Sequence, residues 1–234
     1  MMSVVSRLAL TAALLGSLVA PVVAVSYLHT PEGVEYLEQP SIAAWVAPAT
    51  ALLRPLLDGL GVDRVYLLGT QAMAVSWLAT VVAALAVARR RRPAGLERVW
   101  WWIALLGYAW FTAGLLGFGL LAGLLPPTDA VMDGIFLAGM LPGLLASLIG
   151  SSLLGIGMLR RRDPDRGAAW LLALAVPLWL FANLVLGHNS IGLLPLMWAW
   201  ALASRSAVRR PRSGPVPVTR PGSRSGRRWA ARWG

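Results

Sequence analysis

Few residues in this sequence could carry acid–base or metal chemistry, and they lie near the ends of apolar segments rather than within them. One group combines three amides, a carboxylate and an imidazole: Gln71, Asp133, Asn183, His188 and Asn189. A carboxylate that orients a histidine beside amide groups could bind a small polar ligand or a metal ion. The competing interpretation is that these side chains cap helix ends at the membrane surface, because Asp and Asn favour helix termini. The group is therefore a candidate ligand pocket.

The residue types that most enzyme mechanisms need are missing or badly placed. The chain has no cysteine and no lysine, which excludes thiolate sites and the lysine of a phosphate-binding loop. Its two histidines, His29 and His188, form neither a haem-ligating pair nor a His-Glu-x-x-His zinc motif. The serines at 147, 151 and 152 lack the Gly-x-Ser-Gly context of an intramembrane protease. We therefore predict a non-enzymatic protein with no catalytic residue, no cofactor and no metal.

The clearest spacing in the sequence belongs to small residues. They recur at every fourth position along one apolar segment: Gly139, Gly143, Ser147, Ser151 and Gly155. Small side chains let a second helix approach backbone to backbone, which is how many helices associate in lipid. We predict that this segment is the central helix of a bundle; the alternative is chance in a chain rich in alanine and glycine.

Composition indicates that these residues belong to a membrane protein. Of the 234 residues, 57% are hydrophobic and only 13% are charged, about half the charged fraction of a soluble domain. The apolar residues also form runs near the length of about 20 residues that crosses the hydrocarbon core of a bilayer. The expected fold is all-α: a polytopic bundle of transmembrane helices in the cell membrane.

Six apolar segments are predicted to be membrane helices: 8–28, 65–88, 99–125, 134–159, 167–187 and 190–204. The first could instead be a cleaved signal peptide, with Val22 and Ala24 as its small-residue cleavage site. Pro21 and the continuing apolar run favour an uncleaved helix. The last segment contains Pro195 and is the weakest prediction, since about 15 residues span only ~23 Å.

Between the first two segments, residues 29–64 are expected to form an outer loop. Its first part carries Glu32, Glu35 and Glu38. The following stretch, 41–60, is apolar but contains Pro48 and Pro55, so a simple membrane span is not expected. A short helix lying at the membrane surface and a loop are both consistent with this pattern.

Arginine placement predicts the orientation. If the N-terminus is cytoplasmic, every arginine except Arg54 and Arg64 lies in a cytoplasmic segment. Cytoplasmic segments of membrane proteins carry an excess of basic residues. We therefore expect both termini to be cytoplasmic and residues 1–204 to form one transmembrane domain.

The remaining residues, 205–234, hold nine arginines among Pro, Ser and Gly and are expected to be a disordered basic tail. Its end should anchor on an anionic inner leaflet through a basic and aromatic group: Arg227, Arg228, Trp229, Arg232 and Trp233. Nucleic-acid binding is not favoured, because no nucleic-acid-binding fold accompanies the charge.

Two connections between segments resemble each other. Residues 89–100 read RRRRPAGLERVW and residues 160–170 read RRRDPDRGAAW, so each has an arginine cluster, a proline, a further arginine and a tryptophan. This pattern is typical of a parallel internal repeat, as in some transporters. It would also arise if any tight cytoplasmic turn selected these residue types for the same physical reasons.

The stretch 149–177 (IGSSLLGIGMLRRRDPDRGAAWLLALAVP) resembles a pattern in uncharacterised multi-pass integral membrane proteins of GC-rich, actinobacterial-type bacteria. The shared features are a glycine-rich helix, an arginine-rich tight turn, a tryptophan and a Leu/Ala-rich helix with proline. The resemblance covers about two helices and implies no activity.

Two functions are consistent with the sequence. The favoured one is a scaffold or accessory subunit that associates through small-residue helix faces with a membrane protein or a second copy. The alternative is a small-molecule transporter or binding protein that uses the outward-facing polar pocket.

Overall fold

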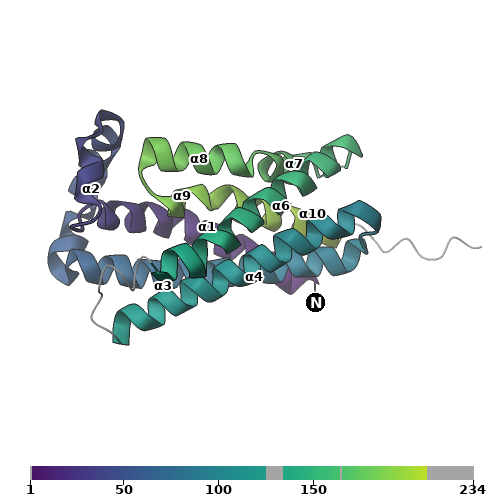
Figure 1. Cartoon of the computed structure of the whole chain (residues 1–234), viewed down its shortest axis with the longest axis horizontal. Coiled ribbons are helices and arrows are strands. Elements are labelled where there is room, and N and C mark those ends of the chain that lie inside the picture. Colours follow the sequence, from purple (N-terminus) through teal and green to yellow (C-terminus); the bar gives the residue numbers. More distant parts are fainter. Residues whose placement is uncertain (1, 125–133, 164, 210–234) are drawn as a thin grey trace, which may run out of the picture.

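The computed structural model describes residues 2–124, 134–163 and 165–209, and this part of the chain contains helices and no β-strand. Figure 1 shows long helices running side by side along the longest axis of the molecule. The long α-helices are α1 (Met2–Tyr27), α2 (Pro40–Leu60), α3 (Val62–Arg91), α4 (Gly95–Leu124), α6 (Leu141–Arg160) and α10 (Leu194–Arg209). The shorter elements are η1 (Val34–Glu38), η2 (Ile135–Met140), α7 (Arg166–Ala173), α8 (Ala175–Leu186) and α9 (Asn189–Gly192).

Most of these helices are long and apolar enough to cross a membrane. Five described stretches qualify: Met2–Tyr27, Val62–Arg91, Gly95–Phe118, Phe136–Arg160 and Asn189–Val208. A sixth is the pair α7 and α8, which are bent by 55° relative to each other. The predicted all-α fold with about six apolar segments is therefore confirmed, and the helices indicate a multi-pass membrane protein.

Two of the breaks between helices coincide with prolines. Pro177 has no N–H to bond the carbonyl of Ala173, and α7 ends at that alanine before α8 begins. Pro142 likewise cannot bond the carbonyl of Ala138, which accepts a hydrogen bond from the indole N–H of Trp110 at 3.2 Å. This contact ties the short π-helix η2 to α4.

The last predicted segment, 190–204, was too short. The apolar stretch runs over Asn189–Val208, because α10 continues for a further turn beyond the predicted end. Pro195 does not shorten the span, since it occupies the first turn of α10, where its missing N–H costs nothing.

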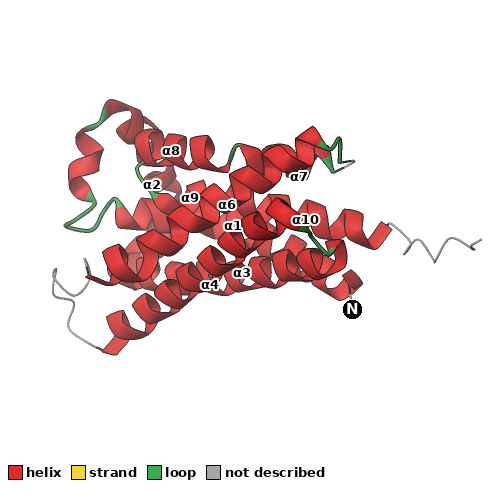
Figure 2. Cartoon of the chain, turned by 45° about the vertical axis from the view of Figure 1, so that its right-hand side comes forward, coloured by secondary structure: helices red, strands yellow, loops and turns green. Residues whose placement is uncertain are grey.

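The stretch 41–60 is a helix, α2, and not a loop. Pro40 begins it, at a position where proline is favoured, and Gly61 ends it with a positive φ of 82°. Figures 1 and 2 show α2 lying across one end of the bundle, at a steep angle to the long helices. Ile42 and Val46, on the face of α2 that meets the bundle, are buried, whereas much of its other face is exposed. With 21 residues it is longer than the short surface helix that the sequence suggested.

The described arginine clusters share one end of the bundle. The beginning of α1 with Arg7, the α3–α4 turn and the α6–α7 turn lie at the end opposite α2 (Figure 1). We call these two ends the arginine end and the α2 end. Arg54 and Arg64 belong to the α2 end, on α2 and at the start of α3.

Candidate functional site

The small-residue stripe of α6 packs against the backbone of α4. An ideal Cβ on Gly143 would lie 2.4 Å from the backbone N of Phe111, and one on Gly107 would lie 2.3 Å from that of Ser147. Gly150, which is not part of the stripe, is equally close to Ala104, at 2.5 Å. Because the obstructing atoms are backbone, no side-chain movement could accommodate a larger residue at these positions.

The two ends of the stripe contact different neighbours. Toward the α2 end, Gly139 lies against Gly114 of α4, and toward the arginine end Gly155 lies against Ala173 of α7. The reason is geometric: a step of four residues turns the helix by about 400°, so the stripe rotates by about 40° at each step. The stripe is therefore covered by contacts within a single chain and does not form an exposed face.

A buried chain of hydrogen bonds crosses the middle of the bundle and joins three helices. The indole N–H of Trp200 on α10 donates to the Tyr108 hydroxyl on α4 at 2.8 Å. That hydroxyl lies 2.5 Å from the Ser151 hydroxyl on α6, which donates to the carbonyl of Ser147. Each member is at most 1% exposed, so all of these polar groups are satisfied away from solvent.

The role of this chain of hydrogen bonds is structural: it holds the helices of the bundle together. Trp77 of α3 packs edge-on against Tyr108, with ring centroids 5.5 Å apart, and adds a fourth helix to the cluster. Sequence reasoning missed Tyr108 and Trp200 because it searched for acids and histidines. The available signal was a tyrosine within an apolar segment, since a buried Tyr hydroxyl needs a partner.

The four described residues of the predicted ligand pocket have separate surroundings, and the pocket itself stays a prediction. Gln71 is exposed on α3, and the amide of Asn183 donates to the carbonyl of Trp179 on its own helix at 2.8 Å. His188 and Asn189 are neighbours at the start of α9; the Oδ1 of Asn189 is buried and has no hydrogen-bond partner among the described residues. Asp133 lies outside the described residues. The α3–α4 groove described below is not lined by Gln71, Asn183, His188 or Asn189.

His188 has a structural role in the turn between α8 and α9. Its Nδ1 accepts a hydrogen bond from the backbone N–H of Ser190 at 3.1 Å, which caps α9. Its ring packs against Tyr27, at a centroid distance of 4.8 Å, and lies 6.2 Å from Tyr66. Burial lowers the pKa of His188 to about 4, so the imidazole is neutral near pH 7. An aromatic cluster with a neutral histidine therefore joins α1, α3 and the α8–α9 turn.

At the arginine end, ion pairs connect the α3–α4 and α6–α7 turns in both directions. Arg91 of the first turn pairs with Asp163 at 2.7 Å and with Asp165 at 3.5 Å in the second. Arg161 of the second turn pairs with Glu97 of the first. Each turn thus supplies an arginine to an acid of the other.

The two turns also share a backbone feature. Arg92 and Arg162 have positive φ values of 49° and 53°, in the left-handed region that residues with a side chain seldom adopt. Each follows the last residues of a long helix and turns the chain toward the next one. This similarity agrees with the sequence likeness of the two hairpins; the internal repeat itself stays a prediction.

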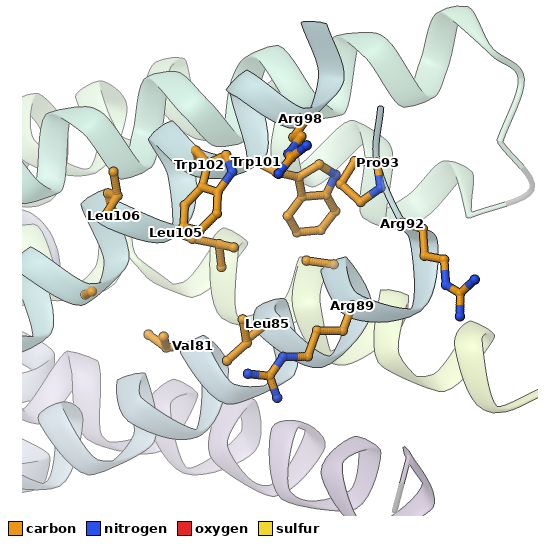
Figure 3. Close-up of a pocket in the computed structure, with 12 residues that line it drawn as sticks. Val81, Leu85, Arg89, Arg92, Pro93, Arg98, Trp101, Trp102, Leu105 and Leu106 are labelled. Carbon is orange, nitrogen blue, oxygen red and sulfur yellow. The ribbon is translucent and has the colours of Figure 1, made fainter. Parts of the chain in front are cut away.

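A cavity of about 560 Å³ opens between α3 and α4 near the arginine end (Figure 3). Three arginines and a proline line it at that end: Arg89, Arg92, Pro93 and Arg98. The other lining residues are apolar: Val81, Leu85, Ala88, Trp101, Trp102, Leu105, Leu106 and Ala109. No acidic residue lines it. We call this cavity the α3–α4 groove.

The predicted surface anchor at 227–233 lies outside the described residues and stays a prediction. Comparison with known proteins adds no assignment: no protein-family model, curated protein or solved structure matches the chain. The function is therefore argued from the geometry of the chain itself.

Proposed function

We propose that this chain is a non-enzymatic scaffold or accessory subunit of the cell membrane, with its arginine end in the cytoplasm. The orientation follows from the gathering of arginine clusters at one end, since basic residues accumulate on the cytoplasmic side of membrane proteins. Both termini are then cytoplasmic, and α2 lies on the outer side.

The observation that carries the proposal is the closed packing between the helices. The α4–α6 contact is made backbone to backbone, and the polar groups at its centre are paired with one another. A transporter needs a water-accessible cavity near the middle of the membrane, lined by groups that bind the substrate. Here the amide of Asn183 is engaged by its own helix and Gln71 is exposed away from the core.

Helix α2 offers a surface for a partner, either another membrane protein or a second copy of this chain. Leu52 is 81% exposed, and Leu56 and Leu60 are also exposed on the same helix. Since α2 is not among the helices that qualify as membrane spans, lipid tails need not cover these leucines. An exposed apolar group of this kind often marks a protein or membrane-surface contact.

The alternative, a small-molecule transporter, is favoured by one observation: the buried and unpartnered Oδ1 of Asn189 beside His188. Cysteine accessibility separates the two functions, because the natural chain contains no cysteine. Cells carrying Asn183→Cys are treated with a membrane-impermeant maleimide. Glu35→Cys, at an exposed position of η1, is the positive control, and the buried Leu148→Cys is the negative control.

A scaffold predicts labelling of Glu35→Cys and none of Asn183→Cys. Rapid labelling of Asn183→Cys from outside would instead show water reaching that depth and favour the transporter. Labelling of Glu35→Cys only after the cells are lysed would contradict the proposed orientation. Whether a water-filled pocket exists would still be decided by the labelling of Asn183→Cys.

A further inference from the structure

The α3–α4 groove brings together two features that suit an amphipathic ligand. Its walls are apolar, and its end carries Arg89, Arg92 and Arg98 (Figure 3). Trp102 and Leu106 are 55% and 61% exposed, so the groove opens on the surface that faces lipid in a membrane. An occupant must therefore be apolar along most of its length and negatively charged at one end.

The length of the groove corresponds to one leaflet of a bilayer. From Arg89 to Val81 along α3 is a rise of about 12 Å, and from Arg98 to Ala109 along α4 is about 16 Å. Half of a hydrocarbon core is about 15 Å thick. The groove thus extends from the level of the headgroups to about the middle of the bilayer, and its volume of about 560 Å³ is in the range of ligand-binding sites.

The arginines of the groove differ from two others at the same turns, Arg91 and Arg161. Arg91 and Arg161 are held by acids of the opposite turn. In contrast, Arg89, Arg92 and Arg98 form no ion pair with any acid in residues 2–124, 134–163 and 165–209. All three are exposed, so their charge is available to an anion from outside the protein.

From these observations we infer that the α3–α4 groove binds a phospholipid with an anionic headgroup, taken from the leaflet at the arginine end. The phosphate lies between Arg89 and Arg98, which approach the groove from its two helices, and one acyl chain follows Leu85 and Leu105 toward Ala109. Arg92 points away from the cavity in Figure 3 and contributes to the general positive potential. The inference goes beyond the scaffold role and does not depend on it.

Basic side chains beside transmembrane helices recognise anionic lipid headgroups by hydrogen bonding and charge. Arginine suits this task because its planar guanidinium can bind two phosphate oxygens at once. The apolar walls add what a surface charge alone lacks: a fixed place for one acyl chain. Specific binding therefore requires both the arginine pair and the open groove.

The test measures how lipid stabilises the purified full chain in detergent. We expect phosphatidylglycerol to raise the melting temperature more than phosphatidylcholine does, and inorganic phosphate to leave it unchanged. In the R89Q/R98Q double variant, the phosphatidylglycerol concentration for half-maximal stabilisation should rise at least tenfold. The matched control is R160Q/R166Q, which removes the same charge from exposed positions at the same end but outside the groove.

A second pair of variants tests the apolar part of the site. Ala109→Phe fills the groove without changing the charge and should weaken the phosphatidylglycerol effect to a similar extent. Ala72→Phe, at an exposed position of α3 outside the groove, is its control and should behave like the natural chain. Equal losses in R89Q/R98Q and R160Q/R166Q would overturn the inference in favour of diffuse charge. A full lipid effect in Ala109→Phe, or stabilisation by inorganic phosphate, would overturn it as well.

Crosslinking gives a result that needs no substitution. The natural chain, reconstituted in vesicles containing phosphatidylglycerol with a photoreactive acyl chain, should be labelled mainly within 81–109. Labelling spread evenly over the lipid-facing helices at the arginine end would contradict a defined site.

Discussion

Helix α4 meets two of its neighbours, α6 and α3, in opposite ways. Against α6 it places Gly107 opposite Gly143 and Ser147, and Ala104 opposite Gly150, so that the two backbones touch. Against α3, near the arginine end, large side chains such as Trp101 and Leu105 stand between the helices and leave a groove. In lipid there is no hydrophobic drive to close such a gap, because acyl chains are as apolar as leucine. Small residues therefore close a membrane interface, and large ones leave space that lipid can fill.

The largest effect is expected where a large residue is forced into the closed interface. Gly143→Leu should lower the free energy of unfolding by about 3 kcal/mol, because its Cβ meets the backbone of Phe111 and no rotamer relieves the overlap. Thermal unfolding in detergent measures this. The matched control is Gly117→Leu on α4, where, among the described residues, nothing beyond the adjacent backbone of its own helix lies within 4 Å of an added Cβ. Equal melting temperatures for the two variants would remove the distinction between closed and open surfaces.

The aromatic cluster at the α2 end predicts a pH effect. The folded chain has a pKa of about 4 at His188, below the ordinary value of 6.5, so the unfolded chain binds a proton more readily as the pH falls. The free energy of unfolding is therefore greatest above pH 6.5 and decreases toward pH 4, by about 1–2 kcal/mol between pH 7 and pH 5.

His188→Gln should remove this dependence, since glutamine does not titrate. Denaturant unfolding at a series of pH values provides the measurement. If the free energy of unfolding of His188→Gln changes between pH 7 and pH 5 as much as that of the natural chain, another group causes the pH dependence. The aromatic cluster would then not be the pH-sensitive part of the molecule.

A smaller effect is expected from the hydrogen-bond chain behind the α4–α6 contact. Tyr108→Phe keeps the ring against Trp77 but leaves the indole N–H of Trp200 without its acceptor. The expected loss is about 1 kcal/mol, in the range measured for polar contacts between membrane helices. Trp170→Phe, at a tryptophan that is 55% exposed, removes a polar N–H outside this chain of hydrogen bonds and should have a smaller effect. A loss that is additive with that of Ser151→Ala would argue that the two hydroxyls are not coupled.

The smallest effect concerns the ion pairs that hold the two arginine turns together. Arg91→Gln should lower stability by less than about 1 kcal/mol, because the pairs are partly exposed and screened by salt. Arg92→Gln removes the same charge one position away, where no acid of the described residues pairs with it, and should have less effect. Unfolding at low and high salt distinguishes the two. Equal stability of Arg91→Gln and Arg92→Gln at low salt would show that the ion pairs of Arg91 do not hold the two turns together.

Several features of this protein were predictable from the sequence because they depend on the length and composition of segments. Apolar runs bounded by arginine or proline predicted the helices. The alternation of arginine-rich and arginine-poor connections predicted that the arginine clusters would share one end of the bundle, and the described clusters do so. The regular stripe of small residues also marked α6 as a helix in close contact. These properties are local, so a linear pattern is sufficient to find them.

Only the tertiary structure decided which side of each helix faces inward. Trp101 is buried and Trp102 is exposed, although both are tryptophans of the same apolar helix. In a soluble protein the polar face would mark the outside, but in a bilayer both faces are apolar and the pattern loses this information. For that reason the sequence could not reveal that Gln71 is exposed, that Tyr108 meets Trp200 and Ser151, or that α3 and α4 leave a groove beneath three arginines.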